Sequence, residues 1–396
     1  MDLFEVHPPL TAKERAEKRR LMVRDFVALF TLVVITVAIG VLTYFLFSSF
    51  SRHRDVLARR WRANGERELR EGHPDQAIDA LRSALQYAPG QRDIEIELAM
   101  ALAADNRNLE AMAYFNTLLE TEPGNGLIHL QVARLAAKEG NAALAEEHYQ
   151  QALDGTWGRD GYLQRLSVRL ELAKYLISQK DYTRAQTQLR TASDNALNMP
   201  EKQMEIGELM EQAHDPSDAL AIYLAQMRKK GAPIDAFVGA GRTAYALGQI
   251  ELARRALERA VEHPEFAKQN PAEQQAVRQM LSDSQTILEL YPDPNLSVRE
   301  RAERISNDAR IAHSRLTACF ASANASGEMA NLQGQWQQIP ARVTVRMLER
   351  NPQLEQTIMS LVYDTEEQTA QVCGAPTGDD ALLLKIAQAP LAVQQQ

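Results

Sequence analysis

The sequence predicts an all-α protein, in which an α-solenoid of about six helix-turn-helix repeats follows a single N-terminal transmembrane helix and precedes a helical C-terminal region. Two observations carry this prediction. Small residues recur at a fixed interval through the middle of the chain, and a long run of uncharged residues stands near its start. A small residue followed by a large apolar residue four positions later, repeated with a period of about 34 residues, is typical of stacked helical hairpins.

The composition is that of an ordinary globular protein. Of its 396 residues, 45% are hydrophobic and 24% are charged, and the net charge at pH 7 is -8. Nucleic-acid binding depends on a clustered surplus of lysine and arginine, so we expect no nucleic-acid partner. The two cysteines, Cys319 and Cys373, lie too far apart in sequence for a metal knuckle, and we expect no bound metal.

Near the start, residues 1–25 are polar and charged and are predicted to form a cytoplasmic leader. Residues 26–50 contain no charged side chain, and as a helix they would more than span a hydrocarbon layer of ~30 Å. A cleaved signal peptide is the alternative, but its apolar core would be shorter and a small-x-small cleavage site would follow. We therefore predict a transmembrane helix over residues 26–50.

The orientation of this helix is weakly determined by the sequence. Six cations precede the span and five follow it: Lys13, Arg15, Lys18, Arg19, Arg20 and Arg24, then Arg52, Arg54, Arg59, Arg60 and Arg62. The positive-inside rule hardly separates the two orientations. Long domains translocate largely regardless of charge, and a lone pair of cysteines suits an oxidising compartment. We therefore predict a single-pass protein of the inner membrane, with a cytoplasmic N-terminus and a periplasmic solenoid.

The repeats are predicted to occupy residues 58–265. The small residue of each second helix stands at Ala77, Ala111, Ala145, Ala185, Ala219 and Ala253, and the intervals are equal except for a longer one between the third and the fourth. Twelve residues earlier stands a small residue of the first helix, at Gly65, Ala99, Ala133, Ala173, Gly207 and Gly241. A large side chain follows each landmark by four residues, at Leu81, Phe115, Tyr149, Leu189, Tyr223 and Leu257. Six extra residues around Trp157 predict a longer loop between the third and fourth repeats.

This pattern resembles the tetratricopeptide repeat (TPR) family, as found in membrane-anchored bacterial proteins. Pro89 and Pro123 close the first two units as the family's consensus requires, although the later units lack this proline. The resemblance implies a concave groove, lined by the first helices, that binds peptides or protein faces. The groove positions that the resemblance implies include Ile96, Met100, Leu130, Arg134, Leu170, Lys174, Ile177, Arg242 and Tyr245.

One groove position carries a cation in three repeats, namely Arg134, Lys174 and Arg242. Such a row could hold carboxylates or backbone carbonyls of a ligand through charge-assisted hydrogen bonds. The alternative is that these are solvated side chains of the inner face. Glutamates of the fifth repeat interrupt the row, at Glu201, Glu208 and Glu211. The lysine and asparagine set with which some co-chaperones of the family clamp a C-terminal carboxylate is absent.

After the repeats, residues 266–296 are predicted to form a helix that caps the solenoid, and residues 297–390 a C-terminal helical region. Within this region, residues 329–349 are expected to be irregular. Cys319 and Cys373 fall near the ends of two predicted helices, so we predict a disulfide between them, the alternative being two buried small apolar residues.

The sequence contains no recognisable catalytic motif. The chain has no HExxH, GxSxG or Walker sequence, and the GxG of residues 239–241 fits a helix contact better than a nucleotide loop. His129 and His148 share a repeat but belong to different predicted helices, and we expect solvated or groove-lining roles for them. We therefore predict a protein that is not an enzyme and has no cofactor or small-molecule substrate.

The predicted function is that of a membrane-anchored adaptor or scaffold that binds protein partners in the solenoid groove. The alternative is a non-catalytic subunit of a cell-envelope enzyme or of a secretion or assembly complex, docking through the C-terminal helical region. Neither hypothesis identifies the partner.

Overall fold

The computed structural model describes residues 12–322, 327–339 and 343–388. Regular structure in this part of the chain is helical apart from one isolated bridge, which confirms the predicted all-α class. The chain divides into two compact units, Met1–Gly161 and Tyr162–Gln396, and each is described by itself.

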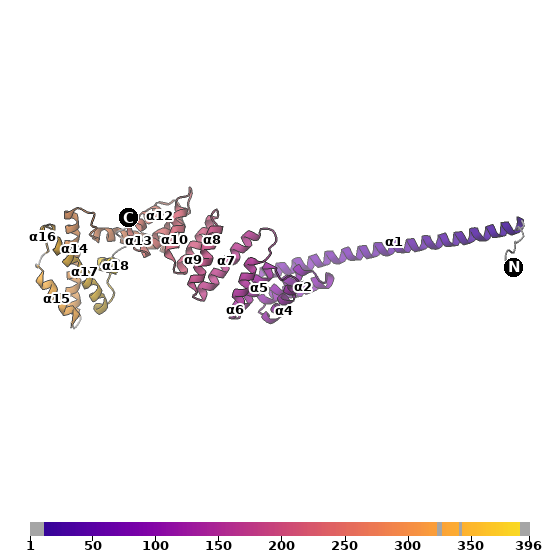
Figure 1. Ribbon diagram of the computed structural model, residues 1–396, viewed down its shortest axis with the longest axis horizontal. Helices are drawn as coiled ribbons and strands as arrows, with labels where there is room; N and C mark the ends of the chain where they lie inside the picture. The colour runs from indigo at the N-terminus through magenta and orange to yellow at the C-terminus, as the bar shows by residue number, and fades with distance from the viewer. Residues whose placement is uncertain (1–11, 323–326, 340–342, 389–396) are drawn as a thin grey trace, which may run out of the picture. The chain divides into compact units, whose positions relative to one another are not determined.

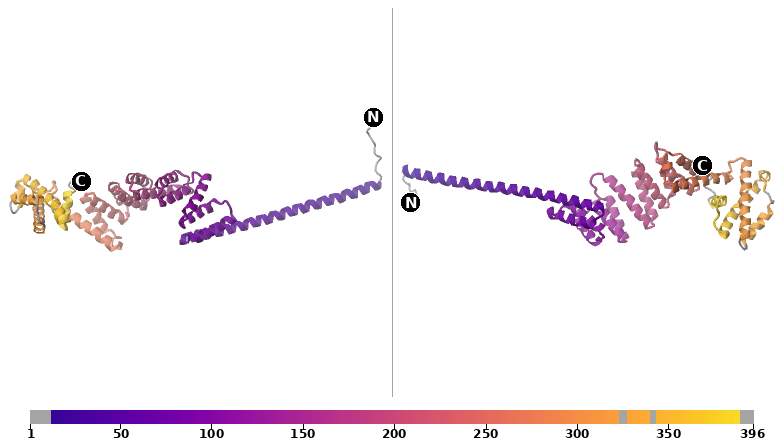
Figure 2. Two further views of the ribbon diagram at one scale, coloured as in Figure 1. Left: turned by 90° about the horizontal axis from the view of Figure 1, so that it is seen from below. Right: turned by 180° about the vertical axis from the view of Figure 1, so that it is seen from behind.

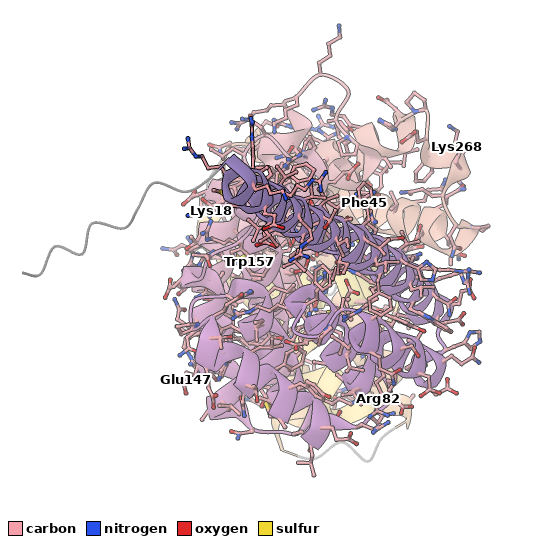
Figure 3. All side chains as sticks on the ribbon, turned by 90° about the vertical axis from the view of Figure 1, so that its right-hand side faces the viewer. Lys18, Phe45, Arg82, Glu147, Trp157 and Lys268 are labelled. Atoms are coloured by element: carbon pink, nitrogen blue, oxygen red, sulfur yellow. A yellow bond between two sulfur atoms is a disulfide. The ribbon has the colours of Figure 1, made fainter. Side chains whose placement is uncertain are left out.

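A single helix, α1 (Ala12–Glu71), carries the predicted span. Its apolar stretch projects from the rest of its unit in Figures 1 and 2, and side chains such as Phe45 in Figure 3 are exposed along it. The helix is long and apolar enough to cross a membrane. From Ala58 onward one side of the helix packs against α2, with Ala58 and Gly65 buried, and this part serves as the first helix of the first repeat. The described part of the leader, the span and this repeat helix are therefore continuous, without a linker.

The first unit contains three hairpins that begin with the end of α1. Their remaining helices are α2 (Pro74–Tyr87), α3 (Arg92–Ala104), α4 (Asn108–Thr121), α5 (Gly126–Lys138) and α6 (Ala142–Asp154). The landmark residues Ala77, Ala111 and Ala145 are fully buried. Inside the first hairpin, a Cβ placed on Gly65 would lie 2.6 Å from the Leu81 side chain, so only glycine fits there.

The loop that the longer repeat interval predicts folds back on the α4–α5 turn. Asn125 and Thr156 form a parallel bridge, and the Thr156 amide donates to the carbonyl of Gly124 at 2.7 Å. The Trp157 indole N–H donates to the carbonyl of Ala152 at 2.8 Å. A Cβ on Gly126 would come within 2.5 Å of this indole. Thr156 and Trp157 therefore hold the start of this loop against the α4–α5 turn, whereas residues 158–160 are exposed.

The second unit begins with three more hairpins. They consist of α7 (Gly161–Ser178), α8 (Tyr182–Asn195), α9 (Pro200–Gln212), α10 (Pro216–Met227), α11 (Ile234–Ala246) and α12 (Ile250–Glu262). The predicted close contacts recur here. A Cβ on Gly207 would lie 2.7 Å from Tyr223, and one on Gly241 would lie 2.5 Å from Leu257. The GxG of residues 239–241 is thus a helix contact, as predicted.

The turn inside each hairpin has one residue in the left-handed conformation. Glycine supplies it at Gly72, Gly140 and Gly248, and other residues at Asn106, Lys180 and His214. A positive φ two residues or fewer past a helix end is the usual way to close a helix tightly. The six hairpins therefore share one turn geometry, although glycine occurs in only half of them.

After the short helix η1 (Phe266–Lys268), the chain forms a bundle. Its helices are α13 (Pro271–Leu290), α14 (Val298–Ser322), α15 (Glu328–Gln338), α16 (Val345–Arg350), α17 (Pro352–Cys373) and α18 (Asp379–Gln388). Helices α14 and α17 are the central pair, and α13 shares their apolar core through Ile287 and Leu290. The predicted end of this region at residue 390 lies outside the described residues.

The expectation that residues 329–349 are irregular is wrong. Helix α15 occupies much of this segment and buries Met329, Leu332 and Trp336, which lie on one face at helical spacing. The Trp336 indole N–H donates to the hydroxyl of Thr365 on α17 at 2.9 Å. Several glutamines and Gly334 hide this apolar stripe in the sequence.

The structure joins Cys319 and Cys373 by a disulfide, with Cα atoms 5.8 Å apart. This bond connects the ends of α14 and α17. The two helices also exchange a polar contact through Arg315, whose Nε–H donates to the Thr369 hydroxyl at 2.8 Å.

Two acids are fully buried in the same bundle, Asp308 on α14 and Glu366 on α17. Neither carboxyl oxygen of Asp308 has a hydrogen-bond partner in the described part of the chain. Burial raises the pKa of Asp308 to about 8, against the opposing effect of Arg304. Burial and the nearby Asp380 raise the pKa of Glu366 to about 8, with Arg315 opposing. Both acids are therefore protonated below this pH.

Replacing Gly126 by alanine tests the packed loop. The new Cβ must displace the Trp157 indole, and we expect the free energy of unfolding to fall by about 1–3 kcal/mol, as is usual for overpacking. Gly124→Ala is the matched control, because no atom lies within 4 Å of a Cβ built there. Urea unfolding of the solubilised chain, followed by circular dichroism, measures both. Equal losses in the two variants would contradict the packed arrangement.

Asp308→Asn tests the buried acid. Between pH ~5 and ~7 the unfolded chain has lost the carboxyl proton while the folded bundle keeps it, so wild-type stability falls as pH rises. The variant should reduce this slope by at most about 1.4 kcal/mol per pH unit. Pulse proteolysis in urea, scoring the fragment that contains α14 and α17, measures the slope. The exposed Asp364→Asn on α17 is the control, and an unchanged slope in Asp308→Asn would refute the assignment.

Candidate protein-binding surface

The nine predicted groove residues divide between the two units. Ile96, Met100, Leu130 and Arg134 belong to α3 and α5 of the first unit, and the other five belong to α7 and α11 of the second. Each unit therefore has an inner face of its own.

In the first unit, two of the three apolar groove positions are core residues. Ile96 is 7% exposed and Leu130 is 6% exposed, so neither offers much surface to a ligand. Met100 is half-buried and Arg134 is exposed. Among the four predicted residues, Met100 and Arg134 are thus the ones that present surface.

In the second unit, α7 shows the same division. Leu170 is 3% exposed, Ile177 is half-buried and Lys174 is exposed. The Lys174 ammonium donates to Oε1 of Glu205 on the neighbouring helix α9 at 2.7 Å. Burial opposes ionisation of Glu205, but the hydrogen bonds from Lys174 and Lys202 hold the pKa of its carboxyl below the ordinary value. The charge of Lys174 is therefore balanced within the protein.

Arg242 on α11 is balanced in the same way. Its guanidinium donates to both carboxylate oxygens of Glu211 on α9, at 2.8 and 3.1 Å. The buried Tyr223 hydroxyl donates to the same carboxylate at 2.7 Å. Burial and the Glu211 carboxylate raise the pKa of Tyr223 above its usual range. These three side chains form one network that links α9, α10 and α11.

Tyr245, at the end of α11, is covered by the C-terminal bundle. The Lys385 ammonium of α18 lies 3.0 Å from the centroid of its ring, and its hydroxyl donates to Asp283 of α13 at 3.4 Å. Burial lowers the pKa of Lys385 to about 8, although Asp283 opposes this change. Side chains of the protein itself therefore cover Tyr245, which is one of the predicted groove residues.

The sequence identified Glu211 as a residue that interrupts the predicted cation row, but Glu205 and the pairing of both glutamates with the row were not predicted. Lys174 with Glu205 and Glu211 with Arg242 are each separated by 31 positions in the sequence. This offset is three residues short of one repeat, so it places the two side chains of each pair on neighbouring first helices. Opposite charges separated by 31 positions in the sequence would have been the signal for these ion pairs.

The expectation of a solvated or groove-lining role is wrong for His129, whereas His148 is half-buried. His129 is buried, and its Nδ1 lies 3.0 Å from Nδ1 of His148. His129 Nε2 lies 2.8 Å from the carbonyl of Pro123, to which it must donate. Burial and the neighbouring His129 lower the pKa of His148. The two rings join α5 to α6.

One group of three metal-type ligands occurs in the described residues, formed by Glu68, Glu71 and His73. Arg67 already contacts both carboxylates, at 2.8 Å from Glu68 and 3.8 Å from Glu71. A cation bound there would have to displace this guanidinium.

Comparison with known families agrees with the helical hairpins. A family model described as tetratricopeptide repeat matches residues 68–135. This segment belongs to the TPR family. Among curated protein sequences, none matches this chain.

Several solved structures are similar at low identity. PilF of Pseudomonas aeruginosa is 17% identical, covers 57% of this chain and 99% of its own, and gives a TM-score of 0.39. PilW, described as a type IV pilus biogenesis factor, is also 17% identical, covers 56% of this chain and 98% of its own, and gives 0.39. Yeast Tom70 is 14% identical, covers 86% of this chain and 54% of its own, and gives 0.37.

The network at Glu211 should contribute measurably to the stability of the second unit. Glu211→Ala removes the acceptor of the buried Tyr223 hydroxyl, and we expect the free energy of unfolding to fall by about 1–3 kcal/mol. Glu208→Ala, one turn earlier on α9, removes an exposed carboxylate without an ion pair in the described part of the chain and should cost much less. Urea unfolding of both variants makes the comparison. Equal stability would show that the network is not structural.

Proposed function

We propose that this protein is a membrane-anchored adaptor that binds protein partners on the inner faces of its TPR hairpins. The observation that carries the proposal is the continuity of α1, which serves both as the exposed apolar helix and as the first helix of the first repeat. A binding surface fixed to a membrane in this way meets partners at the same membrane at a raised effective concentration.

The topology belongs to the same proposal. The N-terminus lies in the cytoplasm and the TPR hairpins in the periplasm of a bacterial-type envelope. The cation count alone favours neither side, but a disulfide between Cys319 and Cys373 is consistent with an oxidising compartment. The protein acts by binding rather than catalysis, since the sequence contains no recognisable catalytic motif.

Site-specific photocrosslinking in native membranes tests the adaptor function. A photoreactive residue at Met100 or Ile177, on the inner faces, should capture partner proteins. The same residue at Glu147, which is exposed on the second helix of its hairpin, is the matched control. Equal capture at all three positions, or none on the inner faces, would refute groove binding. A C-terminal reporter that is active only in an oxidising compartment tests the topology, and an inactive reporter would reverse it.

A further inference from the structure

We propose that a pocket on the inner face of the second unit receives a lysine or arginine side chain of a protein partner. The pocket has a volume of about 200 Å³ and lies between α9, α11 and the start of α13. This inference rests on the proposed adaptor function and specifies the chemistry of the partner.

Negative charge surrounds the pocket. Glu208, Asp235 and Glu273 line it, and all three are exposed. None of them forms an ion pair within the described residues. Arg242 also lines the pocket, but Glu211 balances its charge through two hydrogen bonds. Three carboxylates without an ion pair therefore line the pocket beside one cation that is already paired, and a cationic group entering the pocket is attracted to them.

The pocket also offers an unsatisfied hydrogen-bond acceptor. Gln269 lines it, and the Oε1 atom of Gln269 is buried with no partner in the part of the chain that the structure describes. Leaving a buried acceptor unpaired is unfavourable. Lysine and arginine head groups carry only donors, so either one complements this oxygen as well as the carboxylates.

The shape of the pocket fits a long side chain. Met204 and Val238 contribute apolar surface to its lining, and the buried Tyr223 also lines it. A Cβ on Gly239 would lie 2.8 Å from the Tyr223 ring, so the close approach of α11 to this ring depends on glycine. Lysine and arginine bury their methylene stems against apolar surface while the charged head contacts polar groups. A lining that combines apolar side chains with exposed carboxylates matches that distribution.

A metal ion fits these residues less well. The three carboxylates are not among the groups of described residues whose ligand atoms converge closely enough to hold a cation.

The charge expected of the partner is also opposite to the one that the predicted cation row suggested. Lys174 and Arg242 are balanced by Glu205 and Glu211, whereas the acids that line this pocket have no ion pair among the described residues.

Peptide binding to the solubilised full chain tests the pocket. The probe is a short fluorescent peptide of alternating lysine and alanine, compared with the same peptide bearing acetyl-lysine. The neutralising variant Glu208→Gln/Asp235→Asn/Glu273→Gln should weaken binding of the lysine peptide at least tenfold at physiological salt. The charge-matched control Asp194→Asn/Glu262→Gln/Glu289→Gln changes exposed acids outside the pocket and should leave affinity within twofold.

A second variant removes space instead of charge. Val238→Phe fills the pocket, so it should also abolish discrimination between the lysine and acetyl-lysine peptides, provided that thermal unfolding is unchanged. Equal weakening by the two triple variants would show nonspecific attraction and overturn the proposal. Failure of the wild type to bind the lysine peptide saturably would do the same, as would stoichiometric binding of Ca²⁺ that displaces the peptide.

The outcomes also separate this inference from the adaptor function. If inner-face crosslinking captures partners equally well with and without the neutralising substitutions, the pocket assignment is wrong and the adaptor proposal stands. If inner-face positions capture nothing, the adaptor proposal itself fails.

Discussion

The close approach of a small residue on one helix to a large residue on the next is the constraint on which the hairpins depend. Three hairpins place glycine where any side chain would overlap Leu81, Tyr223 or Leu257. In the other three, alanine occupies the equivalent place, and it is fully buried. The contact fixes the distance and register between the two helices of each hairpin, and it recurs with the repeat period. The insertion around Trp157 breaks that period, and the boundary between the two compact units falls directly after it.

This regular stacking also explains why the inner faces neutralise their own charges. Two residues whose separation in the sequence is three positions shorter than one repeat lie side by side on the first helices of neighbouring hairpins. Three such pairs carry opposite charges: Arg62 with Asp93, Lys174 with Glu205, and Glu211 with Arg242. Side-chain identity at a groove position therefore says little about the charge that a partner meets. A partner meets the charged side chains that have no ion pair with a neighbouring repeat. At the pocket of the second unit these side chains are acidic.

The sequence was sufficient for the parts of the fold that repeat or that extend over many residues. Six in-phase landmarks and the uncharged run of residues 26–50 predicted the hairpins and the apolar helix. Non-periodic packing was not predictable. The α15 stripe is diluted by glutamines, His129 meets His148 only because α5 packs on α6, and Ile96 and Leu130 are buried by neighbouring helices that the groove assignment left out. In each case a tertiary contact decides the role of the residue, and one repeat considered alone does not contain it.

The C-terminal bundle is part of the inner surface rather than a separate module. Lys385 and Asp283 cover Tyr245, and Ile250 of the last hairpin shares an apolar core with Ile287 and the bundle. Deleting residues 297–396 would therefore do more than remove a docking site. It would expose Tyr245 and the apolar side of α13, and the resulting apolar surface beside the acidic pocket would bind proteins nonspecifically. Captured protein in such a deletion would say little about the native groove, whereas substitutions at individual inner-face residues leave this core intact and isolate the binding surface.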